Sequence, residues 1–300
     1  MWILVAILAY FFLAVVSLFD RYFLIGPMPS PKVYTFNVGI FGLIFSLLFL
    51  FFSTGFPAAN VVFLGLLAGA IRMLAVLFLT TSITKSEISR VVPAVGGLQP
   101  VFSFFLFFFF LPQSRILNIY QIAAFVLLIL GTVLISVKKF DKEFFNFQVL
   151  KYPIAASFLY SLTFFLTKNL FLETSFLSGI FLILFGGGLA VLSFLFFPKS
   201  RETILNQKMS GKLSSLFILG QIIGGTAIIL QYYAVFLAEP GQVPLINALE
   251  GTRYVFLLFF VFILSGWKPQ LLKEEVSRKA FLSKILAVLL IGGGLVLLVL

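Results

Sequence analysis

Apolar positions gather into long runs along the chain, with few charged residues between them. These runs lie at 2–19, 33–53, 58–82, 91–111, 116–137, 152–172, 176–197, 213–237, 243–265 and 281–300. Each has about the 20 residues that an α-helix needs to cross the apolar core of a bilayer. Segments such as 102–111 are apolar on every side, so they lack the alternation of a transmembrane β-strand. The pattern predicts an all-α multi-pass membrane protein with ten transmembrane helices.

The composition agrees with a membrane protein and excludes several kinds of chemistry. Hydrophobic residues make up 61% of the chain and charged residues 10%, and the mean hydropathy is +1.17. Cys and His are both absent, which removes disulfides, Cys/His metal or haem sites and a Ser-His protease site. The ten carboxylates include no two neighbouring Asp residues, so an Asp-rich magnesium-diphosphate site is not expected. We therefore expect no enzyme activity, no cofactor and no metal site.

The distribution of basic residues predicts the orientation in the membrane. The chain carries a net charge of +11 and 21 Lys and Arg residues. Arg72 and Arg253 lie inside spans, and Arg115 and Lys168 are assigned to the side of the even-numbered loops. All the others are assigned to the side of the loops after odd-numbered spans. Basic loops stay in the cytoplasm, so we expect both termini on the extracytoplasmic side of the cell membrane. Such loops face anionic lipid, and a nucleic-acid partner is not expected.

The two halves of the chain resemble each other. Segment 9–24 aligns with 156–171, and each is apolar before ending in polar residues. A second alignment places Gly65 on Gly220 and Gly96 on Gly251. We therefore divide the chain into a first repeat at 1–140, a basic linker at 141–151 and a second repeat at 152–300. Five helices are an odd number, so two tandem repeats must insert with opposite polarity. Inverted repeats of this kind are typical of secondary transporters.

Segments in both halves also resemble a known family. The first half has Val92–Phe102, followed by Leu111-Pro112-Gln113 and Gly131–Leu134. The second half has Leu245–Phe256, followed by Leu272–Glu275 and Gly292–Leu295. With the plan of five plus five helices, these segments resemble the drug/metabolite transporter superfamily, EamA type. Pro112-Gln113 stand where that family usually has a Gly-Glu pair. The resemblance implies a central cavity lined by spans 1, 3, 4, 6, 8 and 9.

Polar side chains inside the predicted spans are the candidate site. Charged groups at membrane depth are costly and are functional candidates by default. The candidate substrate-binding residues are Arg72, Gln99, Gln221, Tyr232, Asn247, Glu250, Arg253 and Tyr254. Arg72 shares a helix face with Gly65 and Gly69, whose small size lets another helix come close, so it should face protein or a cavity. Arg253 follows Glu250 by three residues and can reach it.

Two interpretations of these charges remain open. The charged groups could form a structural ion network that joins spans 3, 4 and 9. Alternatively, two Arg and one Glu leave one guanidinium that needs an anionic partner, and a substrate carboxylate or phosphate would supply it. Glu250 is then the expected carrier of a coupling proton.

The function expected from the sequence is secondary active transport of a small organic metabolite, anionic or zwitterionic, by alternating access. Export or exchange is the expected mode, and the protein would act as a monomer or homodimer. Two alternatives belong to other classes. One is a flippase for a lipid-linked substrate, and the other is a membrane scaffold subunit that transports nothing.

Overall fold

The computed structural model describes residues 1–50, 57–85, 88–111, 118–136, 147–207, 210–267 and 278–299, and within these ranges it is helical without strands. The helices of the first half are α1 (Trp2–Ile25), α2 (Pro31–Leu50), α3 (Ala59–Lys85), α4 (Ile88–Phe110) and α5 (Ile119–Ser136). The second half has α6 (Phe147–Glu173), α7 (Phe176–Leu192), η2 (Ser193–Phe196), α8 (Pro198–Leu205), α9 (Gly211–Leu237), η3 (Pro240–Gln242), α10 (Val243–Ala248), α11 (Glu250–Trp267) and α12 (Arg278–Val299).

The helices have the length and composition of membrane spans. Within the described ranges, seven are long and apolar enough to cross a bilayer. Three shorter apolar helices, at Val95–Phe110, Ile119–Leu134 and Ile285–Leu298, lie inside the predicted fourth, fifth and tenth spans. Large apolar side chains also cover the outside of the bundle, as at Leu4 (74% exposed), Phe110 (69%) and Leu289 (65%). Water does not favour such a surface but lipid does, and the chain therefore has the character of a multi-pass membrane protein.

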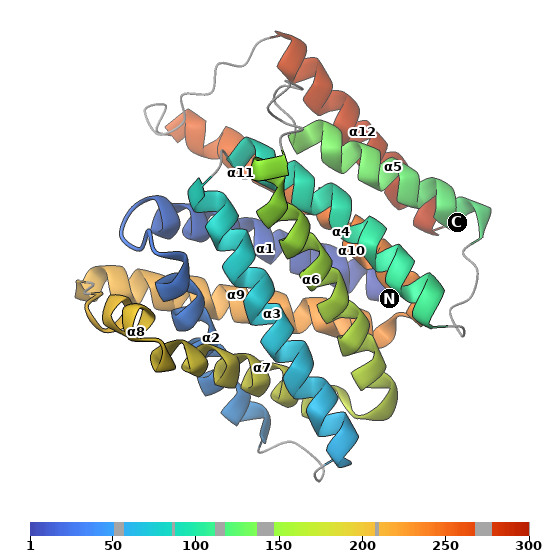
Figure 1. The fold of residues 1–300 in the computed structure, drawn as a ribbon. Coiled ribbons are helices and arrows are strands. Elements are labelled where there is room, and N and C mark those ends of the chain that lie inside the picture. The colour runs from blue at the N-terminus through green and yellow to red at the C-terminus, as the bar shows by residue number, and fades with distance from the viewer. Residues whose placement is uncertain are drawn as a thin grey trace.

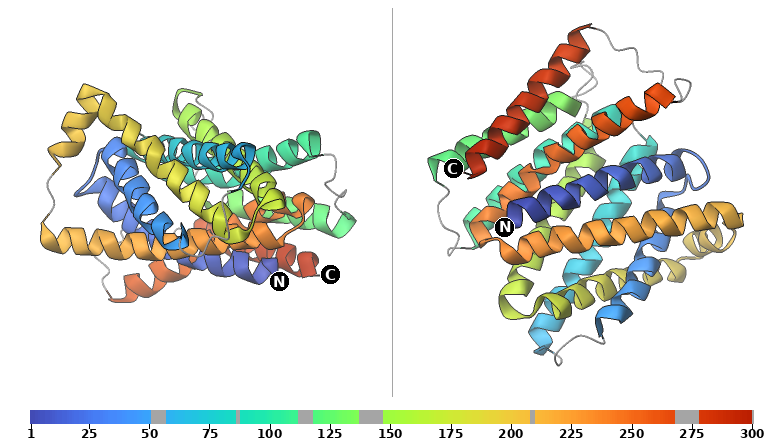
Figure 2. Two further views of the ribbon diagram at one scale, coloured as in Figure 1. Left: turned by 90° about the horizontal axis from the view of Figure 1, so that it is seen from below. Right: turned by 180° about the vertical axis from the view of Figure 1, so that it is seen from behind.

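The helices form one bundle in which segments from both halves alternate (Figure 1). Helix α1 packs along α9, α3 packs along α6 and α7, and α2 packs along α7. At the other side of the bundle, α5 packs along α12, and α4 lies against α6. Both termini lie at the same end of the bundle, and α8 lies at the opposite end (Figures 1 and 2).

The close approach of α3 and α7 depends on glycine, as the small-residue face of segment 65–76 predicted. A Cβ atom at Gly69 would overlap the carbonyl oxygen of Ile183, and one at Gly65 would lie 2.5 Å from Cβ of Leu182. Gly186 meets the backbone of Leu66 from the other side. Only glycine leaves room for the two backbones to touch here.

Several element boundaries differ from the prediction. Helix α1 continues to Ile25, six residues beyond its predicted end, and its last turns include the polar residues Asp20 and Arg21. The predicted ninth span is two helices, α10 and α11, with Leu249 between them. The predicted basic loop after span 7 contains the helix α8, and α6 begins inside the predicted linker. Residues 137–146, which include most of that linker, lie outside the described residues.

Candidate functional site

A cavity of about 370 Å³ lies between the two halves of the chain. Its walls are mostly apolar and come from α1, α2, α3, α4, α6, α7, α9 and α11. Helices α2 and α7 thus contribute to the wall in addition to the helices that the resemblance implied. The cavity reaches the ends of α1 and α3 at Arg21 and Ile83, and Arg21 is exposed. The cavity is therefore open toward the end of the bundle that the charge distribution predicts to be cytoplasmic. Its polar wall residues are Tyr10, Ser17, Asp20, Arg21, Tyr34, Arg72, Thr80, Gln99, Tyr160, Gln221, Gln231, Glu250, Arg253 and Tyr254.

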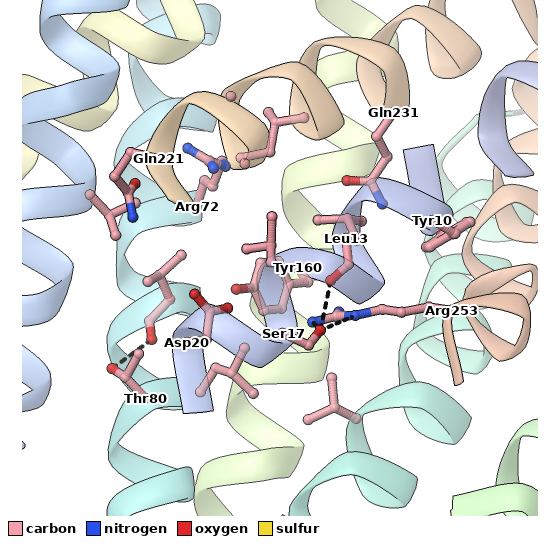
Figure 3. A pocket seen from close by; sticks show the side chains of 18 of the residues that line it. Tyr10, Leu13, Ser17, Asp20, Arg72, Thr80, Tyr160, Gln221, Gln231 and Arg253 are labelled. Carbon is pink, nitrogen blue, oxygen red and sulfur yellow. Dashed lines mark hydrogen bonds between the residues drawn. The ribbon is translucent and has the colours of Figure 1, made fainter. Parts of the chain in front are cut away.

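Arg72 faces this cavity from α3, as its helix face predicted. The side chain is only 8% exposed and lines the cavity wall. Among the residues that the structure describes, none forms a hydrogen bond or an ion pair with it. Figure 3 shows Arg72 turned toward the same space as Gln221 and Tyr160. A buried guanidinium without a protein partner is a binding group for an anion, because guanidinium matches carboxylate and phosphate with two parallel hydrogen bonds.

The second arginine is held in place by protein. Arg253 Nη1 donates to Glu250 Oε1 at 3.2 Å, which confirms the predicted contact between the two residues. Its Nε and Nη2 donate to Ser17 Oγ at 2.9 and 2.7 Å, as the dashed lines in Figure 3 show. Ser17 itself donates to the carbonyl oxygen of Leu13. Glu250 begins α11, where the positive end of the helix dipole also favours a carboxylate. Glu250 and Arg253 thus form a neutral pair that joins α11 to α1.

Asp20 was not among the candidate residues, and the structure places it in the cavity wall. The first predicted span ends at residue 19, one residue before Asp20, whereas α1 includes this residue. The extra last turns of α1 carry Asp20 inward on the face that also holds Ser17. The Tyr34 hydroxyl donates to Asp20 Oδ1. The three-residue spacing from Ser17 to Asp20 was the signal that could have identified it.

The other predicted residues divide between the cavity wall and the packed interior. Gln221 and Tyr254 line the cavity, as does Gln99, whose Nε2 donates to Asn247 Oδ1 at 3.2 Å. Asn247 is fully buried beside the cavity rather than in its wall, and its Nδ2 atom has no hydrogen-bond partner among the residues that the structure describes. Tyr232 is buried against the ring of Phe164 and does not line the cavity.

Buried contacts lie between the cavity and the end of the bundle that holds the termini, and we take that end to be closed. Tyr10 is buried there, and its hydroxyl donates to the carbonyl oxygen of Ile246 at 2.8 Å. Lys168, which the charge distribution assigns to the outer side, is a buried residue of α6 with 4% exposure. Its Nζ donates to the carbonyl oxygens of Val235, Phe236 and Ala238 at 3.2, 3.3 and 2.6 Å. These carbonyls end α9, where the helix leaves acceptors without partners. A lysine at this position satisfies them and holds α6 to α9.

The described part of the chain contains no group of three or more His, Cys, Asp or Glu residues that could hold a metal ion. Asp20 and Glu250 are the cavity's carboxylates, and they lie among cations and hydroxyl groups. The arrangement is suited to recognising a charged organic molecule.

Comparison with known proteins identifies a shared fold only. No protein-family model matches the chain, and no curated protein matches it. Among solved structures, 20 chains match. One of them, described as "Crystal structure of protein", has 16% sequence identity and a TM-score of 0.66, and the match covers 98% of this chain and 93% of that chain. The helical arrangement of almost the whole chain therefore occurs in another protein.

Proposed function

We propose that this protein is a secondary active transporter that moves a small organic metabolite with an anionic group across the cell membrane by alternating access. The observation that carries the proposal is the unpartnered, buried Arg72 in a cavity built by both halves of the chain. Binding sites of secondary transporters lie at such a place, near the bilayer midplane between two repeats. A scaffold subunit needs no cavity and no free guanidinium inside it.

The pairing of helices supports an inverted repeat. If α1 corresponds to α6, α2 to α7, α3 to α9, α4 to α10–α11 and α5 to α12, then equivalent contacts should occur twice. The packing of α3 on α6 has its counterpart in α1 on α9, and the packing of α4 on α6 has its counterpart in α1 on α11. The close pairs α2 with α7 and α5 with α12 join equivalent helices, as pairs on a two-fold axis do, whereas the close packing of α3 on α7 has only a weak counterpart in α9 on α2.

The two ends of the cavity support alternating access. One end is open at Arg21, and the other is closed by Tyr10 and Lys168. A transporter needs a state that is open to one side only, and the reverse state would follow from rocking of the repeats against each other. Coupling to a proton through Glu250 stays a prediction, and its pairing with Arg253 favours a structural role for that carboxylate.

Substrate-dependent thermal stabilisation of the purified protein tests the proposal. The compounds are small carboxylates, phosphate esters, amino acids, amines and neutral sugars at equal concentrations. We expect stabilisation by compounds with a carboxylate or phosphate, since a ligand that binds only the folded state raises its stability. Arg72→Ala should abolish this stabilisation, and Arg201→Ala, which changes an exposed arginine of α8, should leave it intact. Stabilisation of the Arg72→Ala protein equal to that of the wild type would refute the role of Arg72, and a screen without any stabilising compound would favour a scaffold.

A further inference from the structure

The cavity wall contains two carboxylates in different electrostatic situations. Glu250 accepts from Arg253 at 3.2 Å and also from the Tyr254 hydroxyl at 3.4 Å. Its charge is therefore balanced by a partner at hydrogen-bonding distance. Asp20 accepts from the Tyr34 hydroxyl, and among the described residues it has no cation within ion-pair distance. Of the two carboxylates, Asp20 is the one whose charge no direct partner balances.

The charged and titratable neighbours of Asp20 come from four other helices and its own. Arg253 of α11 lies near enough to interact electrostatically with Asp20, but its hydrogen bonds go to Glu250 and Ser17. One guanidinium thus faces two carboxylates. Tyr160 of α6 also interacts with Asp20, and Arg72 of α3 lies in the same cavity (Figure 3). The remaining charged or titratable groups nearby are Arg21, which is exposed, and Tyr34 of α2; the α9 wall contributes only uncharged Gln221 and Gln231.

Apart from Arg21, which is exposed to solvent, the charges of the cavity wall cancel only while the cavity is empty. Arg72 and Arg253 supply two positive charges, and Asp20 and Glu250 supply two negative charges. A monovalent anion bound at Arg72 adds a further negative charge. A net charge deep in the membrane is costly, so the bound anion favours uptake of one proton by the carboxylate that lacks a partner. Linkage requires the reverse effect as well, so that a proton on this carboxylate favours binding of the anion.

We propose that Asp20, rather than Glu250, carries the coupling proton, and that the protein takes up this proton together with the anion bound at Arg72. This inference rests on the proposed transport function. The proton comes from water at the open end of the cavity, binds a carboxylate oxygen of Asp20, and returns to water when the opposite end opens. One proton and one monovalent anion then cross the membrane together without net movement of charge. Tyr34 positions the carboxylate toward the cavity through its hydrogen bond.

Labelling with dicyclohexylcarbodiimide tests this role without a known substrate. This lipid-soluble reagent forms a stable adduct with protonated carboxyl groups and does not react with ionised ones. The full chain in lipid nanodiscs is treated over a range of pH, and the adducts are located by mass spectrometry of peptides. We expect an adduct on Asp20 whose yield falls as the pH rises. Glu250→Gln should keep an adduct on Asp20, with a lower yield at each pH because Arg253 loses its other carboxylate partner, and Asp20→Asn should lose the adduct. Glu173 and Glu202, which are exposed, serve as internal controls for reaction outside the cavity.

The link between the two sites is tested by the same reaction. Arg72→Ala removes one positive charge from the cavity, so Asp20 should keep its proton to higher pH and its labelling should rise at each pH. An adduct on Glu250 without one on Asp20, or no adduct on Asp20 at any pH at which circular dichroism shows folded protein, would overturn the assignment. Asp20 labelling that does not change in Arg72→Ala would overturn the linkage. None of these outcomes depends on transport, so a negative transport screen and a negative labelling experiment refute different claims.

Discussion

Lys168→Met should loosen the packed end of the bundle near the termini and open the cavity there. Methionine keeps the length and apolar stem of the side chain but removes the ammonium group that bonds the last carbonyls of α9. A hydrogen bond to a charged group contributes about 1.5–3 kcal/mol, and burial of the ammonium group offsets part of the total from three such bonds. We expect the closed end to lose about 2–4 kcal/mol relative to the open state. This corresponds to a shift of about 30- to 1,000-fold in the equilibrium between them.

Single-cysteine accessibility measures this shift, because the chain contains no Cys of its own. A cysteine at Leu13, in the cavity wall, should react slowly with a membrane-impermeant maleimide added from the side of the termini. The same cysteine should react faster in the Lys168→Met protein. Lys168→Arg, which keeps the positive charge, should stay near the wild-type rate, and Lys212→Met changes an exposed lysine and should have no effect. An unchanged rate in folded Lys168→Met protein would refute the role of Lys168 in closing that end of the cavity.

Three further predictions follow from the packing and the charges. Gly69→Ala forces a Cβ atom into the backbone of α7 and should lower the free energy of unfolding by about 1–3 kcal/mol. Gly225→Ala, whose Cβ atom would meet nothing within 4 Å, is its matched control. Equal melting temperatures of the two variants would contradict the packing argument. Glu250→Gln should lower the melting temperature, because Arg253 loses its charge partner, while uptake driven by a pH gradient persists; loss of that coupling in a stable variant would instead make Glu250 the proton carrier. Arg72→Lys should weaken substrate binding about tenfold in thermal-shift titrations, because a point charge cannot form two parallel hydrogen bonds, and unaltered affinity would contradict bidentate binding.

The helical architecture could be predicted from the sequence because the signal is local. Runs of about 20 apolar residues predict the long helices. The spacing of Gly65 and Gly69 indicates the face of α3 that packs closely. The position of Arg72 followed from that face. The contact between Glu250 and Arg253 could also be predicted, because three residues along a helix separate them.

The rest of the site depends on how distant helices pack, and the sequence does not encode that locally. Asp20 looked like the end of a span because a charged pair usually marks one, but α1 continues through it and carries it into the cavity. Lys168 was counted only as an outer positive charge, because its partners lie about 70 residues further along the chain. Tyr232 has the spacing of a cavity residue but is covered by Phe164 of another helix. In each case the neighbouring helix decided the role.

The central claim is that Arg72 binds the transported anion inside a cavity that opens to each side in turn. The most direct measurement is uptake of the stabilising anion, in radiolabelled form, by proteoliposomes that contain wild-type, Arg72→Ala or Arg201→Ala protein. The wild type and Arg201→Ala should accumulate the anion when the lumen is made more alkaline than the medium. Arg72→Ala should lose about 100-fold or more of the initial rate at subsaturating anion, because two charge-assisted hydrogen bonds are lost. Uptake by Arg72→Ala at the wild-type rate would contradict the account.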